Sequence, residues 1–140
     1  MTKPPEPINL NTQTVRNIVL AEEYGHLGSK VVSERQRALM NALAEEPQVL
    51  FATEDSVKAL DIVGRVELQH IGEEDRLLFP ENHTHMHIQW CRVKEARKEE
   101  HRSWHGVTFH DENGTLLFGY WLDKPKDFST QVHQLLGTLI

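Results

Sequence analysis

The stretch His83–Trp90 reads HTHMHIQW, and its histidines occupy every second position. Successive side chains of a β-strand point to opposite faces of a sheet, so this spacing predicts a strand over about residues 83–93. The histidines would share one face with Gln89 and Cys91. The other face would carry the more apolar set, which is Thr84, Met86, Ile88 and Trp90. We therefore expect the apolar face to meet the core and the histidines to face solvent or a ligand.

The composition narrows the class of protein around this strand. A chain of 140 residues with 39% hydrophobic and 26% charged residues is typical of one soluble globular domain. The net charge of −6 argues against general nucleic-acid binding, and no apolar run reaches the ~18 residues that a membrane span needs. The N-terminus lacks the apolar core of a secretory signal, and Cys91 is a single, free thiol. These features predict a cytoplasmic protein.

Upstream of the histidine strand, the sequence predicts a loose arm over residues 1–12 and a mainly helical segment over 13–64. Apolar residues at helical spacing predict a helix over 14–24. Ser33 and Gln36 form a capping-box pattern before a second helix, which Pro47 ends. The segment 53–64 repeats the pattern of a polar start and spaced apolar residues, and we expect a third helix there.

Residues 65–140 change to the pattern of an antiparallel sheet with a closing helix. Strands are predicted over 65–71 and 75–80, followed by the histidine strand. Residues 93–102 are strongly charged and are interpreted as a connection. Alternating residues on both sides of Asp111–Gly114 predict a hairpin, and the tail 127–140 has the spacing of one helix. The chain is therefore predicted to be a single α+β domain: N-terminal helices, an antiparallel meander and a C-terminal helix.

The histidine pattern leaves several interpretations open. The imidazoles could be polar surface residues of a non-catalytic interaction module. Alternatively, histidines at positions i and i+2 of a strand can reach one metal ion, so His83, His85 and His87 could bind zinc or iron in a metal-binding protein or metal-dependent enzyme. Pairing with the next strand would bring His110 close as a further ligand. No sequence motif for nucleotide binding or a serine nucleophile accompanies them.

Residues 64–139 also resemble the repeat unit of the HemS/HutX-type heme-utilisation proteins. The matching pieces are a histidine- and tryptophan-bearing strand at 83–93, a charged connection after it, a hairpin made of 107–115 and 116–122, and a final helix at 128–136. The segment ENHTH, at 81–85, is similar to the corresponding segment of the single-unit carriers. The resemblance implies a cytoplasmic protein with an antiparallel sheet and flanking helices, which carries heme, and single-unit members pair into homodimers.

The chain departs from that family at one position that matters for heme. The Gly-His pair that contributes to heme binding in the carriers is replaced by residues Arg76–Pro80. If heme is bound, we expect His83, His85 and His87 to supply the iron ligand, with His110 in support and Arg92 available to the propionates. The aromatic residues available as pocket walls are Phe118, Tyr120 and Trp104.

Two further expectations complete the sequence-based interpretation. The segment 116–122, LLFGYWL, is apolar on both faces of the predicted strand. The sheet would therefore expose more apolar surface than one layer of helices can cover. We therefore expect a homodimer. The function expected from the resemblance is that of a heme carrier, and no catalytic residues are assigned.

Overall fold

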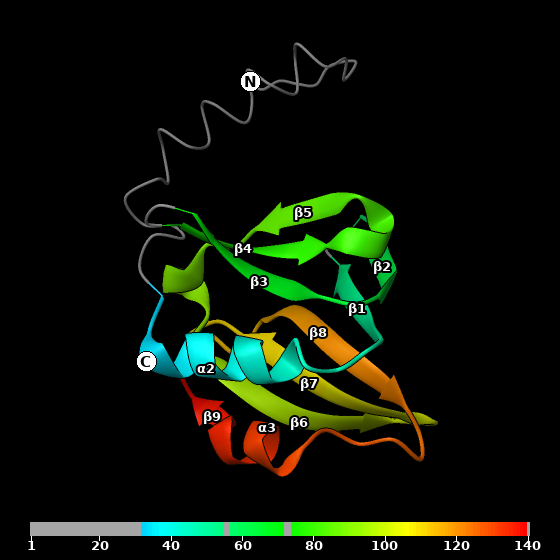
Figure 1. Ribbon diagram of the computed structural model, residues 1–140. Coiled ribbons are helices and arrows are strands. Elements are labelled where there is room, and N and C mark those ends of the chain that lie inside the picture. Colours follow the sequence, from blue (N-terminus) through cyan, green and yellow to red (C-terminus); the bar gives the residue numbers. More distant parts are fainter. Residues whose placement is uncertain (1–31, 55–56, 72–73, 140) are drawn as a thin grey trace.

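The computed structural model describes residues 32–54, 57–71 and 74–139 (Figure 1). The predicted arm, 1–12, and the predicted helix, 14–24, lie outside these residues. The described chain contains two helices and two antiparallel sheets, so the α+β class is confirmed.

Helix α2, Glu34–Leu43, begins where the capping box predicts. The Ser33 hydroxyl accepts a hydrogen bond from the Gln36 backbone N–H, and the Gln36 side chain accepts one from the Ser33 backbone N–H. These two bonds satisfy backbone donors that a helix N-terminus otherwise leaves unpaired. The apolar side chains of Leu39 and Leu43 are buried, so the predicted stripe faces the core.

The larger sheet has six strands in the order β2-β1-β8-β7-β6-β9, and all neighbours are antiparallel. Its strands are β1 (Val49–Glu54), β2 (Ala59–Gly64), β6 (Glu95–His101), β7 (Trp104–His110), β8 (Leu116–Asp123) and β9 (Gly137–Thr138). The hairpin between β7 and β8 confirms the predicted turn. There the Asp111 carboxylate accepts hydrogen bonds from the backbone N–H groups of Asn113 and Thr115, each 2.9 Å long. Gly114 adopts a φ of 79°, which favours glycine.

The smaller sheet carries the histidine strand. It consists of β3 (Glu67–Ile71), β4 (Glu74–Phe79) and β5 (Thr84–His87), in that order. Short 3-10 turns flank β5: η1 spans Pro80–Asn82 and η2 spans Trp90–Arg92. The predicted strands over 65–71 and 75–80 correspond to β3 and β4.

Two predictions from charge and spacing are wrong. The segment 53–64, predicted as a helix, contains the end of β1 and all of β2. Its apolar residues pair with β1 at the edge of the sheet, and this tertiary pairing overrides a weak helical pattern. The charged connection predicted over 93–102 contains β6. Its Ala96 is buried against the core, while its long charged side chains stay partly exposed at the sheet surface.

Two other predicted elements are shorter than expected. Strand β5 ends at His87, because the chain then turns inward and buries Ile88 and Trp90. The alternation expected as far as Cys91 therefore holds for four residues. The closing helix is α3, Thr130–Leu135, capped by the Ser129 hydroxyl, and the chain then extends into β9.

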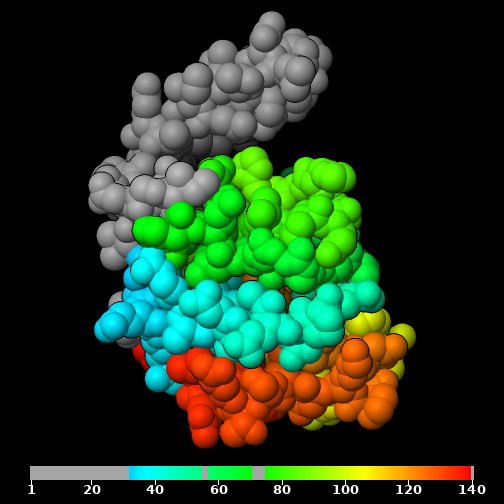
Figure 2. All heavy atoms as spheres, in the orientation of Figure 1, coloured from blue at the N-terminus to red at the C-terminus, as the bar shows by residue number. Residues whose placement is uncertain are grey.

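The core lies between the sheets and α2. In Figure 2, α2 forms a band below the small sheet and above the C-terminal segment. Aromatic side chains fill the interior, and the rings of Phe109 and Phe118 stack with centroids 4.6 Å apart. The ring centroids of Phe51 on β1 and Phe79 on β4 are 5.0 Å apart, so this ring pair joins the two sheets. The histidine strand is thus held on the core by packing beneath its sheet.

Candidate functional site

The predicted two-sided character of the histidine strand is observed in β5. Met86 pairs with the buried Leu77 of β4, so this face meets the core. His85 and His87 lie on the opposite, exposed face. Their rings approach each other with centroids 5.2 Å apart and planes at 77°. His83 is exposed too, but it precedes the strand in a left-handed conformation with φ of 52°.

A hollow of about 210 Å³ lies between β5 with the segment after it and strands β1 and β8 of the larger sheet. We call it the histidine hollow. Its apolar wall includes Met86, Ile88 and Phe118, while His87 and Arg92 contribute nitrogen-bearing groups. Its complete lining is Thr53, Met86, His87, Ile88, Gln89, Arg92, Val93, Leu117 and Phe118. An imidazole and a guanidinium therefore border one mainly apolar surface, a combination that suits a flat apolar ligand with acidic substituents.

The Arg92 guanidinium remains accessible in this arrangement. Its side chain is 61% exposed, and it forms a loose ion pair with the Asp111 carboxylate, 4.0 Å away. The backbone N–H of Thr115 holds the pKa of the Asp111 carboxyl below its ordinary value; the backbone N–H of Asn113 and the charge of Arg92 act in the same direction. Because the pair is loose and exposed, Arg92 retains donors for an anionic ligand.

His110 does not join this site. It is buried on β7 in the other sheet, and both its ring nitrogens have partners. Nε2 lies 2.8 Å from the Thr108 hydroxyl and Nδ1 lies 3.2 Å from the Gly114 carbonyl oxygen. The expectation that strand pairing would bring His110 to His85 is wrong, because β5 pairs with β4 and not with β7.

The metal interpretation finds no ligand set in the part of the chain that the structure describes. Within residues 32–54, 57–71 and 74–139, no group of three or more histidine, cysteine, aspartate or glutamate side chains could hold an ion. His85 and His87 supply two imidazoles on one face of β5.

The three aromatic wall candidates occupy separate places. Phe118 lines the histidine hollow as expected. Tyr120 is fully buried in the core, and this burial raises the pKa of its hydroxyl. Trp104 lies on the far face of the larger sheet. The sequence did not indicate Thr53 or Leu117, because these wall residues come from strands whose approach to β5 depends on tertiary packing.

Buried polar contacts hold the segment after β5 in position. The Gln36 side-chain amide of α2 donates to the carbonyl oxygens of Trp90, at 3.1 Å, and Val93, at 2.8 Å. The Trp90 indole N–H donates to the Asp75 carbonyl oxygen at 3.2 Å. These bonds brace both ends of η2, and so they position the Arg92 backbone at the rim of the histidine hollow.

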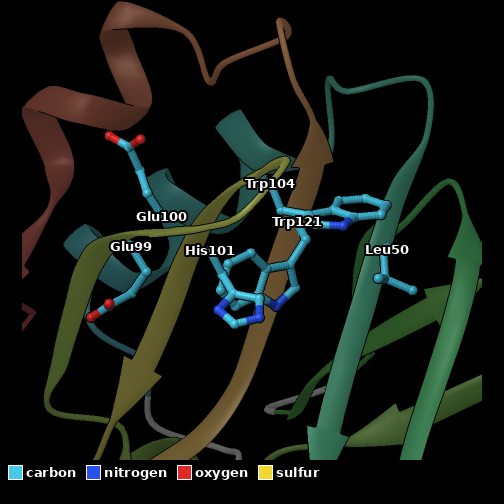
Figure 3. Close-up of a pocket in the computed structure, with 6 residues that line it drawn as sticks. All are labelled: Leu50, Glu99, Glu100, His101, Trp104 and Trp121. Carbon is cyan, nitrogen blue, oxygen red and sulfur yellow. The ribbon is translucent and has the colours of Figure 1, made fainter.

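A second hollow, of about 390 Å³, lies on the larger sheet and is shown in Figure 3. We call it the tryptophan hollow. It is lined by Leu50, Glu99, Glu100, His101, Trp104 and Trp121. In Figure 3, Trp104 extends toward Leu50 and Trp121 lies toward His101. The alternation of tryptophan with glycine in β7 and β8 is the sequence signal for this surface, although it does not by itself identify a ligand.

Comparisons with known proteins establish the fold. No family model and no curated protein sequence matches the chain. Among solved structures, a protein from Erwinia carotovora is similar, with a TM-score of 0.54 and 14% identity, covering 91% of this chain and 94% of its own. ChuX is similar with a TM-score of 0.52 and 16% identity, covering 84% of each chain. The chain therefore shares its fold with these proteins over most of its length. Among the residues that the structure describes, no helix combines the length and apolar character needed to cross a membrane.

Proposed function

We propose that the chain is a heme-utilisation protein of the carrier type, with heme as its cargo. Two independent likenesses support this proposal. Residues 64–139 resemble the heme-utilisation repeat in sequence, and the fold matches that of ChuX, a heme-utilisation protein. The single observation that carries the proposal is the histidine hollow, where His87 and Arg92 border one apolar surface.

The residues at the histidine hollow suit heme chemically. Heme iron accepts an axial imidazole, and its propionates favour a guanidinium. His87 is the proposed iron ligand because it is the one imidazole of β5 that lines the hollow. His85 and His83 are the alternatives on the same exposed surface. Arg92 is the proposed propionate contact, and His110 is withdrawn because its nitrogens are engaged in the other sheet.

The size of the hollow limits how heme could be held. Pockets that enclose a ligand typically measure about 300–1,000 Å³, whereas this hollow measures about 210 Å³. It can take one apolar edge of the porphyrin, and the remainder would lie against the exposed side chains around it. Partial enclosure agrees with a protein that releases its cargo to an acceptor.

Heme titration of the purified chain tests the proposal. We expect a sharpened, shifted Soret band that saturates, and we expect His87→Ala to weaken binding at least tenfold. Arg92→Ala should weaken binding less and without changing the iron spectrum, because it removes a propionate contact only. His133→Ala, on α3 away from the hollow, is the matched control and should bind as the wild type does.

The possible results separate the proposals about function from those about individual residues. An unchanged Soret band at every heme concentration would refute heme binding. Saturable binding that His87→Ala leaves intact would refute the ligand assignment alone, and His85→Ala and His83→Ala would then be compared.

We also propose a cytoplasmic homodimer. The family resemblance and the apolar residues on both faces of segment 116–122 support this proposal.

A further inference from the structure

The small sheet has one face packed on the core and another that points away from it. Leu77 and Phe79 of β4 are buried, so the alternation of a strand turns the residue before each of them to the opposite face. We call this opposite face the upper face, because Figure 1 shows the small sheet above the larger one. The register with β3 and β5 adds residues of these two strands. The upper face includes Glu67, Gln69, Arg76, Leu78, His85 and His87.

Arg76 of the upper face is partly buried and lacks an acidic partner. Four of the described arginines are partly buried, and three of them pair with a carboxylate, namely Arg37, Arg65 and Arg97. The Arg76 side chain forms no hydrogen bond or ion pair with any residue in the part of the chain that the structure describes. A guanidinium that is partly removed from water needs a compensating partner. Arg76 is therefore a place where an anionic group of a ligand can bind.

The strand register places Arg76 directly beside His87. Opposite residues on one face of an antiparallel pair have Cβ atoms about 4.5–5.5 Å apart, so both side chains can contact the same ligand. His87 also lines the histidine hollow, which Arg92 borders. Because β4 lies on one side of β5 and the hollow on the other, His87 stands between two arginines.

The neighbours of Arg76 in the register are compatible with a bound anion. Gln69, which lies opposite Arg76 on β3, is neutral and carries an amide donor. Glu67 shares the upper face, but its carboxylate is already paired with Arg65. Leu78 adds a partly buried apolar side chain opposite His85, so part of this surface suits the plane of an apolar ring.

We propose that Arg76 binds a carboxylate of the cargo, and that the site therefore accepts iron-free porphyrin dicarboxylates as well as heme. The inference rests on the proposed function, because it adds a contact and a ligand class to the same site around His87. Heme carries two propionates, and two guanidiniums lie on either side of this imidazole. A guanidinium binds a carboxylate through two parallel hydrogen bonds, which supply orientation as well as energy. Recognition of the acidic groups does not require iron.

Titration of the wild type with protoporphyrin IX tests the inference without any variant. We expect saturable binding that is weaker than that of heme, because the bond between iron and an imidazole is missing. The dimethyl ester of protoporphyrin IX has two neutral groups in place of the carboxylates. It should bind at least tenfold more weakly than the free acid when both are measured in the same dilute detergent.

Variants separate the carboxylate contact from the iron contact. Arg76→Met should weaken the binding of heme and of protoporphyrin at least fivefold each, while the Soret band of the heme complex keeps its position. Arg76→Lys should recover part of the affinity, because it retains the charge without the planar fork. His87→Ala should weaken heme binding but change the affinity for protoporphyrin less than threefold. Arg102→Met, exposed in the turn between β6 and β7, is the matched control and should bind both ligands as the wild type does.

The outcomes distinguish this inference from the proposed function. Heme binding without protoporphyrin binding would overturn the inference and leave the proposed function standing. Equal affinities for the acid and its ester, or unchanged binding of both ligands by a folded Arg76→Met variant, would overturn it in the same way. If neither heme nor protoporphyrin binds, the proposed function fails and the inference fails with it.

Discussion

His85 and His87 show how two residues of one kind acquire different chemistry from position alone. Both project from the exposed face of β5, yet only His87 borders the hollow where Phe118 and Arg92 meet the small sheet. His110 shows the opposite case, since its two hydrogen-bonded nitrogens make it a structural histidine of β7. Spacing in the sequence identifies a set of imidazoles, and the neighbours supplied by other strands decide which one can bind a ligand.

Gly106 is the residue whose substitution should report most directly on the packing of Trp121 in the tryptophan hollow. Gly106→Ala would place Cβ within 2.3 Å of Trp121, so the indole must lift from the sheet. We expect a loss of about 1–3 kcal/mol in the free energy of unfolding, the typical cost of overpacking, measured by urea denaturation. In a Trp121→Ala background the same substitution should cost much less. Additive effects of the two changes, within about 0.5 kcal/mol, would show that the indole does not rest on Gly106.

Gln36 connects the N-terminus of α2 to the turn η2. Its side chain completes the capping box of α2 and also donates to two carbonyl oxygens around η2. Gln36→Leu retains similar volume but removes the side-chain donor from both carbonyl oxygens, of which that of Trp90 still accepts a hydrogen bond from the Val93 backbone N–H. We expect a loss of about 2 kcal/mol in the free energy of unfolding.

The same Gln36→Leu variant should also weaken heme binding, because η2 carries Arg92 at the rim of the hollow. Thermal unfolding and heme titration measure the two effects, and Gln131→Leu on exposed α3 is the control. Normal heme affinity in a destabilised Gln36→Leu variant would show that the hydrogen bonds around η2 do not determine heme binding.

At the scale of elements, the β7–β8 hairpin provides a test with acid. The backbone N–H of Thr115 lowers the pKa of Asp111 below its ordinary value of 3.8. A lowered folded-state pKa means that the ionised carboxylate stabilises the fold above the unfolded-state pKa and that this stability is lost as pH falls through the folded value. Asp111→Asn keeps the side-chain oxygen acceptor but cannot ionise. The advantage of the wild type over this variant should be constant from pH 7 to pH 5 and shrink below about pH 4. Urea midpoints across this range measure it, and a constant difference down to pH 2 would contradict the assignment.

Elements with local signals could be predicted from the sequence, and those that depend on distant partners could not. The capping box of Ser33 and Gln36 and the turn at Asp111–Gly114 are made within a few residues, and both are confirmed. The sequence of strand β6 was interpreted as a charged connection because Ala96 is its single fully buried residue, so the sequence lacks the alternation of a strand. Its strand conformation depends on pairing with β7, which is distant information for a local pattern. Strand β2 could not be predicted for the same reason, because it is formed by pairing with β1 at the edge of the sheet. The histidine hollow was half predicted: His87, Arg92 and Phe118 were named, while Thr53 and Leu117 reach it by tertiary packing.

At the scale of the whole molecule, a buried carboxylate links α2 to the small sheet. Asp75 of β4 is completely buried, and its carboxylate accepts hydrogen bonds from Arg37 of α2, at 2.9 Å from Nε and 2.8 Å from the terminal nitrogen. Its other oxygen is hydrogen-bonded to the ring of His70 on β3. A buried charge is tolerated when its partners are complete, and the removal of one partner is strongly destabilising. The attachment of the small sheet, and with it the histidine hollow, depends on this cluster.

Removal of Arg37 should therefore loosen the histidine strand before the rest of the fold. Arg37→Met retains the aliphatic part of the side chain but leaves Asp75 with His70 as its remaining side-chain partner, so we expect a loss of about 3 kcal/mol in the free energy of unfolding. The double variant Arg37→Met/Asp75→Leu removes the buried charge as well and should recover part of that loss. Hydrogen exchange should show β3, β4 and β5 losing protection in Arg37→Met while β7 and β8 retain it, because the six-stranded sheet does not use this ion pair. Asn41→Met, at an exposed position of the same helix, is the control. Uniform loss of protection across both sheets in Arg37→Met would show that the small sheet does not open separately, and that the histidine strand is as stable as the core beneath it.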